Sequence, residues 1–166
     1  KENKPEIFHR TYKFMQSNSY IVFKLTGVMS QDHSQGYGIH FFDMLGWIFG
    51  EVKNNVVNIS EPTRAGGYLE LKNARVRWFL SLNSNDLPAE CREKGQRTFR
   101  SITIEGEELE FSDGFTELHT STYNEIIEGR GFGLDDARQS VVTAYTIRNA
   151  VPIGLQGNYH PVLKTL

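Results

Sequence analysis

The chain has 166 residues, of which 18 are Lys or Arg and 20 are Asp or Glu, so its formal net charge at pH 7 is −2. With 39% hydrophobic residues the chain can bury the core of one globular domain, and its balanced charge excludes nucleic-acid binding through bulk positive charge. The single Cys91 excludes an intrachain disulfide and a cysteine-based zinc site, and no apolar stretch is long enough to cross a bilayer. We therefore expect a cytoplasmic protein with no nucleic-acid or membrane partner.

The first part of the chain predicts strands followed by one helix. Residues 8–14 and 20–25 are rich in β-branched and aromatic side chains and are separated by a polar stretch, which is typical of two strands. The aperiodic residues 27–36 predict a loop. The largely apolar residues 39–49 then predict a mostly buried helix that ends at Gly50.

The middle of the chain predicts two antiparallel hairpins. Apolar and polar residues alternate over 69–80 around a turn at residues 72–73, and a second alternation over 102–111 surrounds the turn pair at 105–106. The polar residues 84–96 between the hairpins predict a loop.

The last third of the chain changes to a helical period. Residues 118–127 predict a helix closed by Gly129, residues 137–148 predict a longer helix, and the aperiodic tail after Pro152 predicts a surface segment. Strands followed by helices, with one helix early, indicate an α+β fold. We expect an open, mostly antiparallel sheet with helices packed on one face.

Two simple kinds of binding site are not predicted. The Gly-rich residues 129–133 suggest a dinucleotide loop, but a helix precedes them, and the last Gly of that fingerprint would fall at Leu134. A helix stop followed by a turn explains them better. The five His residues lie in five different segments without zinc-ligand spacing, so we expect neither a cofactor site nor a metal site in this chain.

His40 and Asp43 have catalytic potential, because a spacing of three residues at the predicted helix start places both on one face. The positive end of the helix dipole favours a neutral imidazole that can act as a general base. The negative charge of Asp43 has the opposite effect, because it favours the protonated imidazolium. On spacing alone, a structural His beside an Asp that the dipole favours is the better interpretation.

Seven ordered blocks of the sequence are similar to one protein family. They are GIHFFDML (38–45), GYLEL (67–71), ARVRWFLS (74–81), NDLP (85–88), RSITI (100–104), GFTELHT (114–120) and GFGLDDAR (131–138). From about Thr11 to Ala150 the chain resembles the C-terminal domain of the glucose-fructose oxidoreductase and inositol dehydrogenase superfamily. Within it, the bacterial UDP-N-acetylglucosaminuronate 3-dehydrogenases of lipopolysaccharide O-antigen biosynthesis resemble the chain most.

The resemblance implies an NAD-dependent parent enzyme in which residues 1–166 form the C-terminal substrate-binding and oligomerisation domain. The N-terminal Rossmann domain that binds NAD is absent from this chain, so the fragment alone is expected to be inactive. His40 matches the family's catalytic His, which takes a proton from the sugar 3-hydroxyl while hydride passes to the nicotinamide. This reverses the preference for a structural His40. Tyr20 and Asp43 are the expected contacts to the UDP-sugar substrate.

A homodimer or homotetramer through the sheet face that the helices leave uncovered is also expected, because relatives use this sheet for tetramers. Phe79 shares a strand face with Arg77 and Ser81, where water favours polar groups, so it is a predicted contact residue.

An alternative is a non-catalytic assembly domain that keeps the fold with a degenerate site. Relatives usually have a Gly-Gly segment and an Asn before the catalytic His, whereas this chain has Gln35, Gly36 and Tyr37. These changes fall where UDP-sugar is expected to bind, so they are compatible with altered specificity or lost activity.

Overall fold

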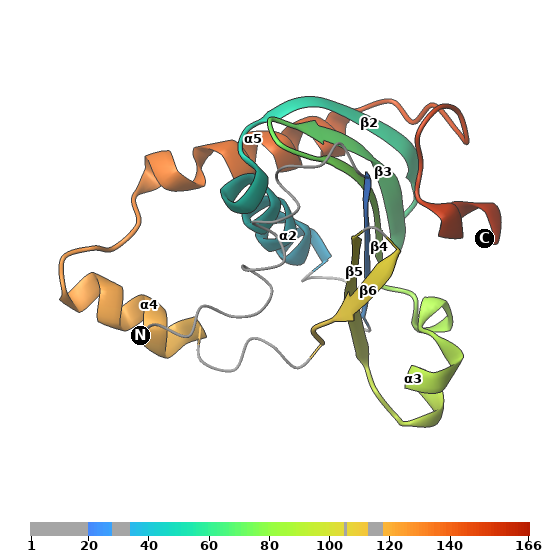
Figure 1. Cartoon of the computed structure of the whole chain (residues 1–166), viewed down its shortest axis with the longest axis horizontal. Helices are drawn as coiled ribbons and strands as arrows, with labels where there is room; N and C mark the ends of the chain where they lie inside the picture. The colour runs from blue at the N-terminus through green and yellow to red at the C-terminus, as the bar shows by residue number, and fades with distance from the viewer. Residues whose placement is uncertain (1–19, 28–33, 105, 113–117) are drawn as a thin grey trace.

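The computed structural model describes residues 20–27, 34–104, 106–112 and 118–166. The expected strand over residues 8–14 lies outside them. The fold is α+β, as predicted. Within the described residues, the open sheet has the order β2-β3-β4-β1-β5-β6, and its neighbouring strands are antiparallel except for the parallel pair β1 and β4. Helices α2 and α5 lie against one face of this sheet (Figure 1).

The strands are β1 (Tyr20–Gly27), β2 (Val52–Ser60), β3 (Arg64–Leu71), β4 (Arg75–Ser81), β5 (Thr98–Ile104) and β6 (Glu107–Glu110). The helices are α2 (Ser34–Phe49), α3 (Ala89–Glu93), α4 (Leu118–Ile127) and α5 (Leu134–Asn149), with short 3-10 helices η2 (Ser84–Asp86) and η3 (Pro161–Lys164). Both predicted hairpins are confirmed, as β3 with β4 and β5 with β6.

Two predicted loops are wrong in part. Helix α2 begins at Ser34 rather than after Gly36, because its first turn is polar and shows no apolar period. The predicted loop over residues 84–96 contains η2 and α3, which are too short to produce a complete helical period. This segment has its own small buried cluster of Leu87, Cys91 and Phe99.

The core lies between the sheet and helix α2. The ring of Phe42 meets the ring of Trp78 edge-on, with centroids 5.5 Å apart, and both side chains are buried. Near the start of α2, a Cβ atom on Gly38 would lie 3.5 Å from Leu80; at its end, the Asn73 backbone N–H donates to the Phe49 carbonyl at 3.0 Å. Helix α2 therefore runs over β4 from the end of that strand towards its beginning.

Helix α5 packs beside α2 and over β2, at one side of the sheet. Gly46 allows a close approach, because a Cβ atom there would lie 2.7 Å from the Gln139 side-chain nitrogen. That nitrogen donates to the Gly50 carbonyl at 3.3 Å, and Asn55 of β2 donates to the Thr146 hydroxyl at 3.3 Å. The two helices thus form one layer on this face.

The C-terminal segment after Pro152 covers part of the opposite face, which confirms it as a packed surface segment. The backbone N–H groups of Ile153 and Gly154 donate to carbonyls of β2, both at 3.0 Å. The His160 ring lies 5.9 Å from the Phe79 ring, measured between centroids, and Phe79 is fully buried. The prediction that Phe79 is a contact residue for another subunit is therefore wrong. This apolar side chain on the face opposite the helices packs within the chain itself.

Replacing Gly67 with Ala tests the packing at the centre of the sheet. A Cβ atom there would overlap the carbonyl oxygen of Val56 and lie 2.9 Å from the Trp78 ring. We expect the free energy of unfolding to fall by about 1–3 kcal/mol, the usual cost of overpacking, in urea unfolding followed by circular dichroism. Gly38→Ala is the matched control, because its Cβ makes only ordinary contacts within a helix, and we expect unchanged or higher stability. Equal stability of the Gly67→Ala and unmodified proteins would contradict the packing.

Candidate functional site

His40 and Asp43 lie on the exposed side of α2, away from the sheet. Their neighbours Phe41, Phe42 and Leu45 are buried against the core, with exposed fractions of 5% or less. The spacing prediction is confirmed in that both side chains are exposed one turn apart on the same helix. An imidazole in this position is accessible to a substrate or to another domain.

The dipole argument for His40 is wrong, however. Because α2 begins at Ser34, His40 lies in the second turn rather than the first, and the helix dipole acts mainly within the first turn. The chemistry of His40 must therefore come from what approaches it, and not from the end of its own helix.

Tyr20 is the first residue of β1 and pairs in register with Arg75, at the beginning of β4. The turn of α2 that carries His40 lies between the contacts to Leu80 and Trp78, near the end of β4. The backbone therefore separates Tyr20 from His40 by roughly four strand residues, or about 13 Å. The structure places His40 and Asp43 one turn apart on α2, whereas the backbone of Tyr20 lies at the beginning of β1. The role of Tyr20 stays a prediction.

Trp47 continues the exposed side of α2, seven residues after His40, and its side chain is 73% exposed. Residues at spacings of three, four and seven share one face of a helix, so the sequence carried the signal in the series 40, 43, 47. A single exposed aromatic side chain is common at a protein surface, so Trp47 extends this face of α2 without by itself marking a binding site.

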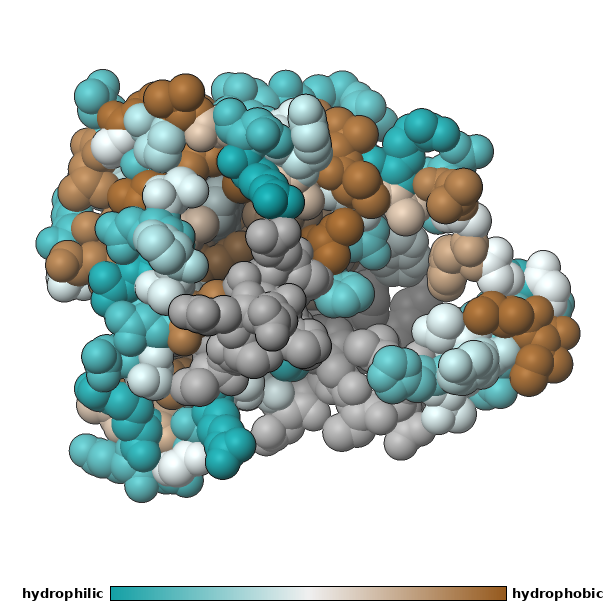
Figure 2. Space-filling view, turned by 180° about the vertical axis from the view of Figure 1, so that it is seen from behind, coloured by the Kyte–Doolittle hydropathy of each residue, from teal (hydrophilic) through white to brown (hydrophobic). Residues whose placement is uncertain are grey.

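Helix α4 presents a second exposed apolar surface. Tyr123, Ile126 and Ile127 are 65%, 55% and 81% exposed. Figure 2 shows hydrophobic side chains on the projecting lobe that α4 forms, away from the sheet. The helix end is held by Arg130, whose guanidinium donates to both carboxylate oxygens of Glu125 at 2.8 and 3.0 Å and so lowers the pKa of that carboxyl.

Gly129 has a φ of +75° and lies two residues after the end of α4, between the two helices. This left-handed backbone is the usual end of a helix, so the residues 129–133 form a helix stop and a turn, as predicted. Among the described residues, no three His, Cys, Asp or Glu side chains are arranged to hold a metal ion. No helix in the described part of the chain is long and apolar enough to span a membrane.

A buried polar cluster joins the β3–β4 hairpin to η2. Arg64 donates to both oxygens of Asp86, at 2.7 and 2.6 Å, and the Ser81 hydroxyl donates to the same carboxylate at 2.5 Å. The hydrogen bond to Asp86 raises the pKa of Arg64. The cluster has the residue types of a catalytic site, but its groups satisfy one another, and it lies at the end of the hairpin. We interpret it as a structural anchor.

Replacing Asp86 with Asn tests this anchor. The Asp86 side chain is 5% exposed and that of Arg64 is 23% exposed, so the change removes the nearer carboxylate of a largely buried cation and leaves only the more exposed Glu61, at 3.8 Å. Removing one partner of a fully buried pair costs roughly 3–5 kcal/mol, and partial exposure reduces this, so we expect a loss of about 2 kcal/mol in urea unfolding. Asp135→Asn is the control: its ion pair with Arg138 is exposed, and its loss should change stability by less than about 0.5 kcal/mol. A similar effect of both variants would exclude the anchor.

No protein-family model matches the chain. Among solved structures, the chain is similar to the WlbA (WbpB) dehydrogenase from Thermus thermophilus in complex with NAD and α-ketoglutarate, with 35% identity and a TM-score of 0.82. It matches the complex of this dehydrogenase with NAD and UDP-GlcNAcA equally well, with 35% identity and a TM-score of 0.83. Each match covers 95% of this chain, which confirms the resemblance found in the sequence.

The chain spans little more than half of those structures, 57% and 56% of their length. A putative oxidoreductase from Thermotoga maritima has the same fold, with 11% identity, a TM-score of 0.58 and coverage of 86% of this chain and 56% of its own. The shared fold, and the likeness to a dehydrogenase solved with NAD and UDP-GlcNAcA, thus extend over nearly the whole of this chain.

Proposed function

We propose that this chain is the substrate-binding domain of an NAD-dependent dehydrogenase that oxidises the 3-hydroxyl of a UDP-N-acetylated glucuronate for lipopolysaccharide O-antigen synthesis. The observation that supports this most is the 35% identity, over 95% of the chain, to a dehydrogenase solved with NAD and UDP-GlcNAcA. The exposed His40 on α2 fits this role, because a general base must contact its substrate, and an exposed side chain can do so without any change in the core.

In this proposal His40 removes the proton of the 3-hydroxyl, and the C3 carbon loses a hydride, so that the alcohol becomes a ketone. NAD, held by a nucleotide-binding half outside this chain, would supply the acceptor for that hydride. Asp43, one turn away on the same side of α2, contacts the sugar or orients the imidazole. Two exposed groups on a rigid helix keep a fixed spacing, which is what positioning of a sugar ring requires.

Replacing His40 with Asn tests the catalytic role in an enzyme that contains the nucleotide-binding half. General bases contribute about 10²–10⁴ in rate, so we expect turnover of UDP-GlcNAcA, followed as NADH absorbance, to fall by about a hundredfold or more. The exposed side chain of His40 predicts unchanged thermal unfolding. Glu90→Gln on α3 is the control and should keep full turnover. Near-normal turnover of His40→Asn would make His40 structural.

The alternative function is a non-catalytic assembly domain, favoured by the replacement of the usual residues before His40 by Gln35, Gly36 and Tyr37. The two functions differ in one measurement. The enzyme reduces NAD when UDP-GlcNAcA is added, whereas an assembly domain with a degenerate site does not.

We further propose that residues 1–166 alone bind no NAD. The Gly cluster over residues 129–133 lies between two helices, and not between a strand and a helix as a dinucleotide site requires. Titration calorimetry with NADH should therefore show no heat of binding to the isolated chain. Micromolar binding would overturn this prediction and return attention to the turn between α4 and α5.

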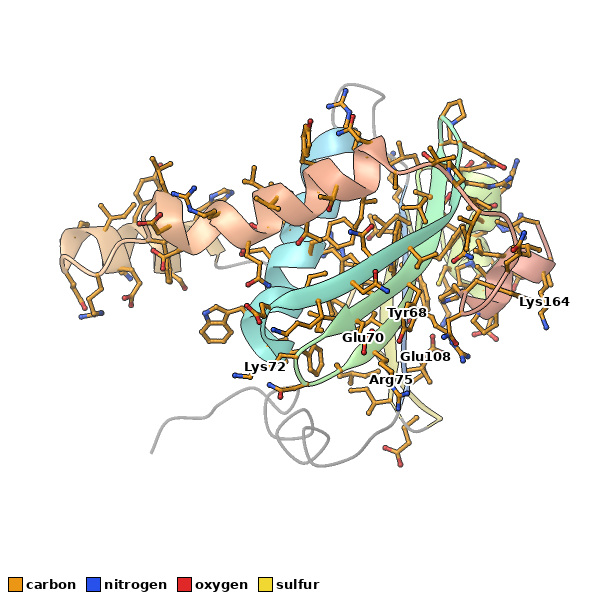
Figure 3. All side chains as sticks on the ribbon, turned by 90° about the horizontal axis from the view of Figure 1, so that it is seen from above. Tyr68, Glu70, Lys72, Arg75, Glu108 and Lys164 are labelled. Atoms are coloured by element: carbon orange, nitrogen blue, oxygen red, sulfur yellow. The ribbon has the colours of Figure 1, made fainter. Side chains whose placement is uncertain are left out.

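Self-association through the sheet face opposite the helices is also a proposal. With Phe79 covered by the C-terminal segment, the charged part of this face remains, and Figure 3 shows Glu70, Arg75 and Glu108 there. Glu70 is opposite Arg75 in the register of β3 and β4. A face that carries both charges can pair with a second copy of itself about a twofold axis.

Replacing Glu70 with Lys tests this surface by placing a positive charge opposite Arg75 and on the proposed interface. We expect light scattering to show a dimer or tetramer for the unmodified protein at micromolar concentration, and a smaller species for Glu70→Lys with an unchanged circular dichroism spectrum. Glu90→Lys on α3 is the control and should leave the assembly intact. A monomeric unmodified protein would contradict the proposal.

A further inference from the structure

Helix α5 presents most of its larger apolar side chains outward. The face that packs on α2 and β2 buries three side chains, those of Ser140, Thr143 and Ile147. The opposite face has four apolar side chains with exposed fractions of 51–90%, those of Leu134, Val141, Val142 and Tyr145. A surface helix in contact with water normally shows the reverse arrangement, with polar groups outside. Another molecule is therefore expected to cover the outer face of α5.

The exposed side chains form one continuous stripe along the helix. Leu134, Arg138, Val141, Val142 and Tyr145 follow one another at the spacings of one, three and four residues that share a helix face, and we call them the outer stripe. Arg138 and Tyr145 lie at its centre, with the two valines on either side. In Figure 1, α5 lies along the upper edge of the molecule with α2 beneath it. A second helix can therefore lie along the outer stripe.

The outer stripe is complementary to a second copy of itself in the antiparallel orientation. Arg138 precedes Val141 by three residues, and Tyr145 follows Val142 by three. A twofold axis at the two valines therefore places each valine beside its own counterpart, and Arg138 of each copy over the Tyr145 ring of the other. A guanidinium over an aromatic ring is a favourable contact. Arg138 keeps its ion pair with Asp135, at 2.8 Å, because stacking uses the flat face of the guanidinium.

The charges at the ends of α5 favour the same orientation. Asp135 and Asp136 lie in the first turn, and Arg148 lies in the last turn. Asp135 precedes Val141 by six residues and Arg148 follows Val142 by six, so the antiparallel pair brings opposite charges together at both ends. A parallel pair would instead bring together like charges and like ends of the two helix dipoles.

The apolar area is sufficient for a specific dimer. Phe132, two residues before α5, and Val151, two residues after it, are 72% and 84% exposed and fall opposite each other in the antiparallel pair. With about 150–250 Å² for an aromatic side chain and roughly half of that for an aliphatic one, these two and the apolar part of the outer stripe expose on the order of 600 Å² per copy. Two copies then bury about 1,200 Å², where specific interfaces begin.

We propose that a second copy of this chain covers the outer stripe, with the two α5 helices antiparallel about a twofold axis at Val141 and Val142. This interface is separate from the sheet face proposed above, because α5 lies on the other side of the sheet. Two different twofold interfaces on one chain generate a closed tetramer. The inference does not depend on the reaction that the parent enzyme catalyses.

Replacing Val142 with Glu tests the outer stripe by placing two like charges beside the twofold axis. Like charges in contact cost several kcal/mol, so we expect the dissociation constant of this interface, from light scattering of the chain at micromolar concentration, to rise about tenfold or more. The circular dichroism spectrum should not change, because Val142 is 54% exposed. Lys94→Glu, in the exposed turn after α3, is the control and should leave association unchanged. Unchanged association of Val142→Glu, or a monomeric unmodified chain, would overturn the proposal.

Single cysteines on α5 test the position of the axis. Val142→Cys lies beside its own counterpart, so mild oxidation should give a disulfide-linked dimer on a denaturing gel. Leu134→Cys is the matched control: it is more exposed, but its counterpart lies about 22 Å away along the helix pair, so the chain should stay unlinked. The unmodified chain, whose single Cys91 is buried, gives the background.

Equal cross-linking of Val142→Cys and Leu134→Cys, or none for Val142→Cys, would overturn the antiparallel pair. The change Glu70→Lys separates this interface from the sheet face. It should leave the cross-link of Val142→Cys intact, and loss of the cross-link with Glu70→Lys would show that α5 forms no interface of its own.

Discussion

The contact between Phe42 and Trp78 determines the arrangement of the domain. The Trp78 ring can lie against β3 only because Gly67 has no side chain, and the edge of that ring then meets Phe42 of α2, with centroids 5.5 Å apart. This packing sets both the direction and the rotation of α2 on the sheet. Because the rotation is set, the side chains of His40, Asp43 and Trp47 point away from the core. The site therefore depends on a contact that contains none of its residues.

Local sequence patterns predicted most of the helices and strands. The main features that they did not predict are contacts between segments far apart in the sequence. The hairpins β3–β4 and β5–β6 were predicted because alternation and a short turn are both local. The insertion of β1 between β4 and β5, parallel to β4, leaves no periodic signal, since the partners are far apart in sequence. The burial of Phe79 was missed for the same reason: the segment that covers it begins more than seventy residues later.

The prediction of the candidate site depended less on periodic sequence patterns than the prediction of the fold did. His40 was selected by resemblance, and the physical argument for it failed because a polar turn extends α2 to Ser34. Charge and spacing identify which residues can take part in chemistry, whereas tertiary packing determines which of them lie close together.

The C-terminal segment has a consequence for the edges of the sheet. Among the strands that the structure describes, β2 is one edge, and the backbone N–H groups of Ile153 and Gly154 donate to the carbonyls of its residues Val57 and Asn58. Strand β6 is the other edge; it is four residues long and three of them are exposed Glu. Short, charged or covered edges resist the addition of a foreign strand. Among the described strands, the two edges of the sheet are thus protected by different means, and both means oppose the pairing of a strand from another molecule.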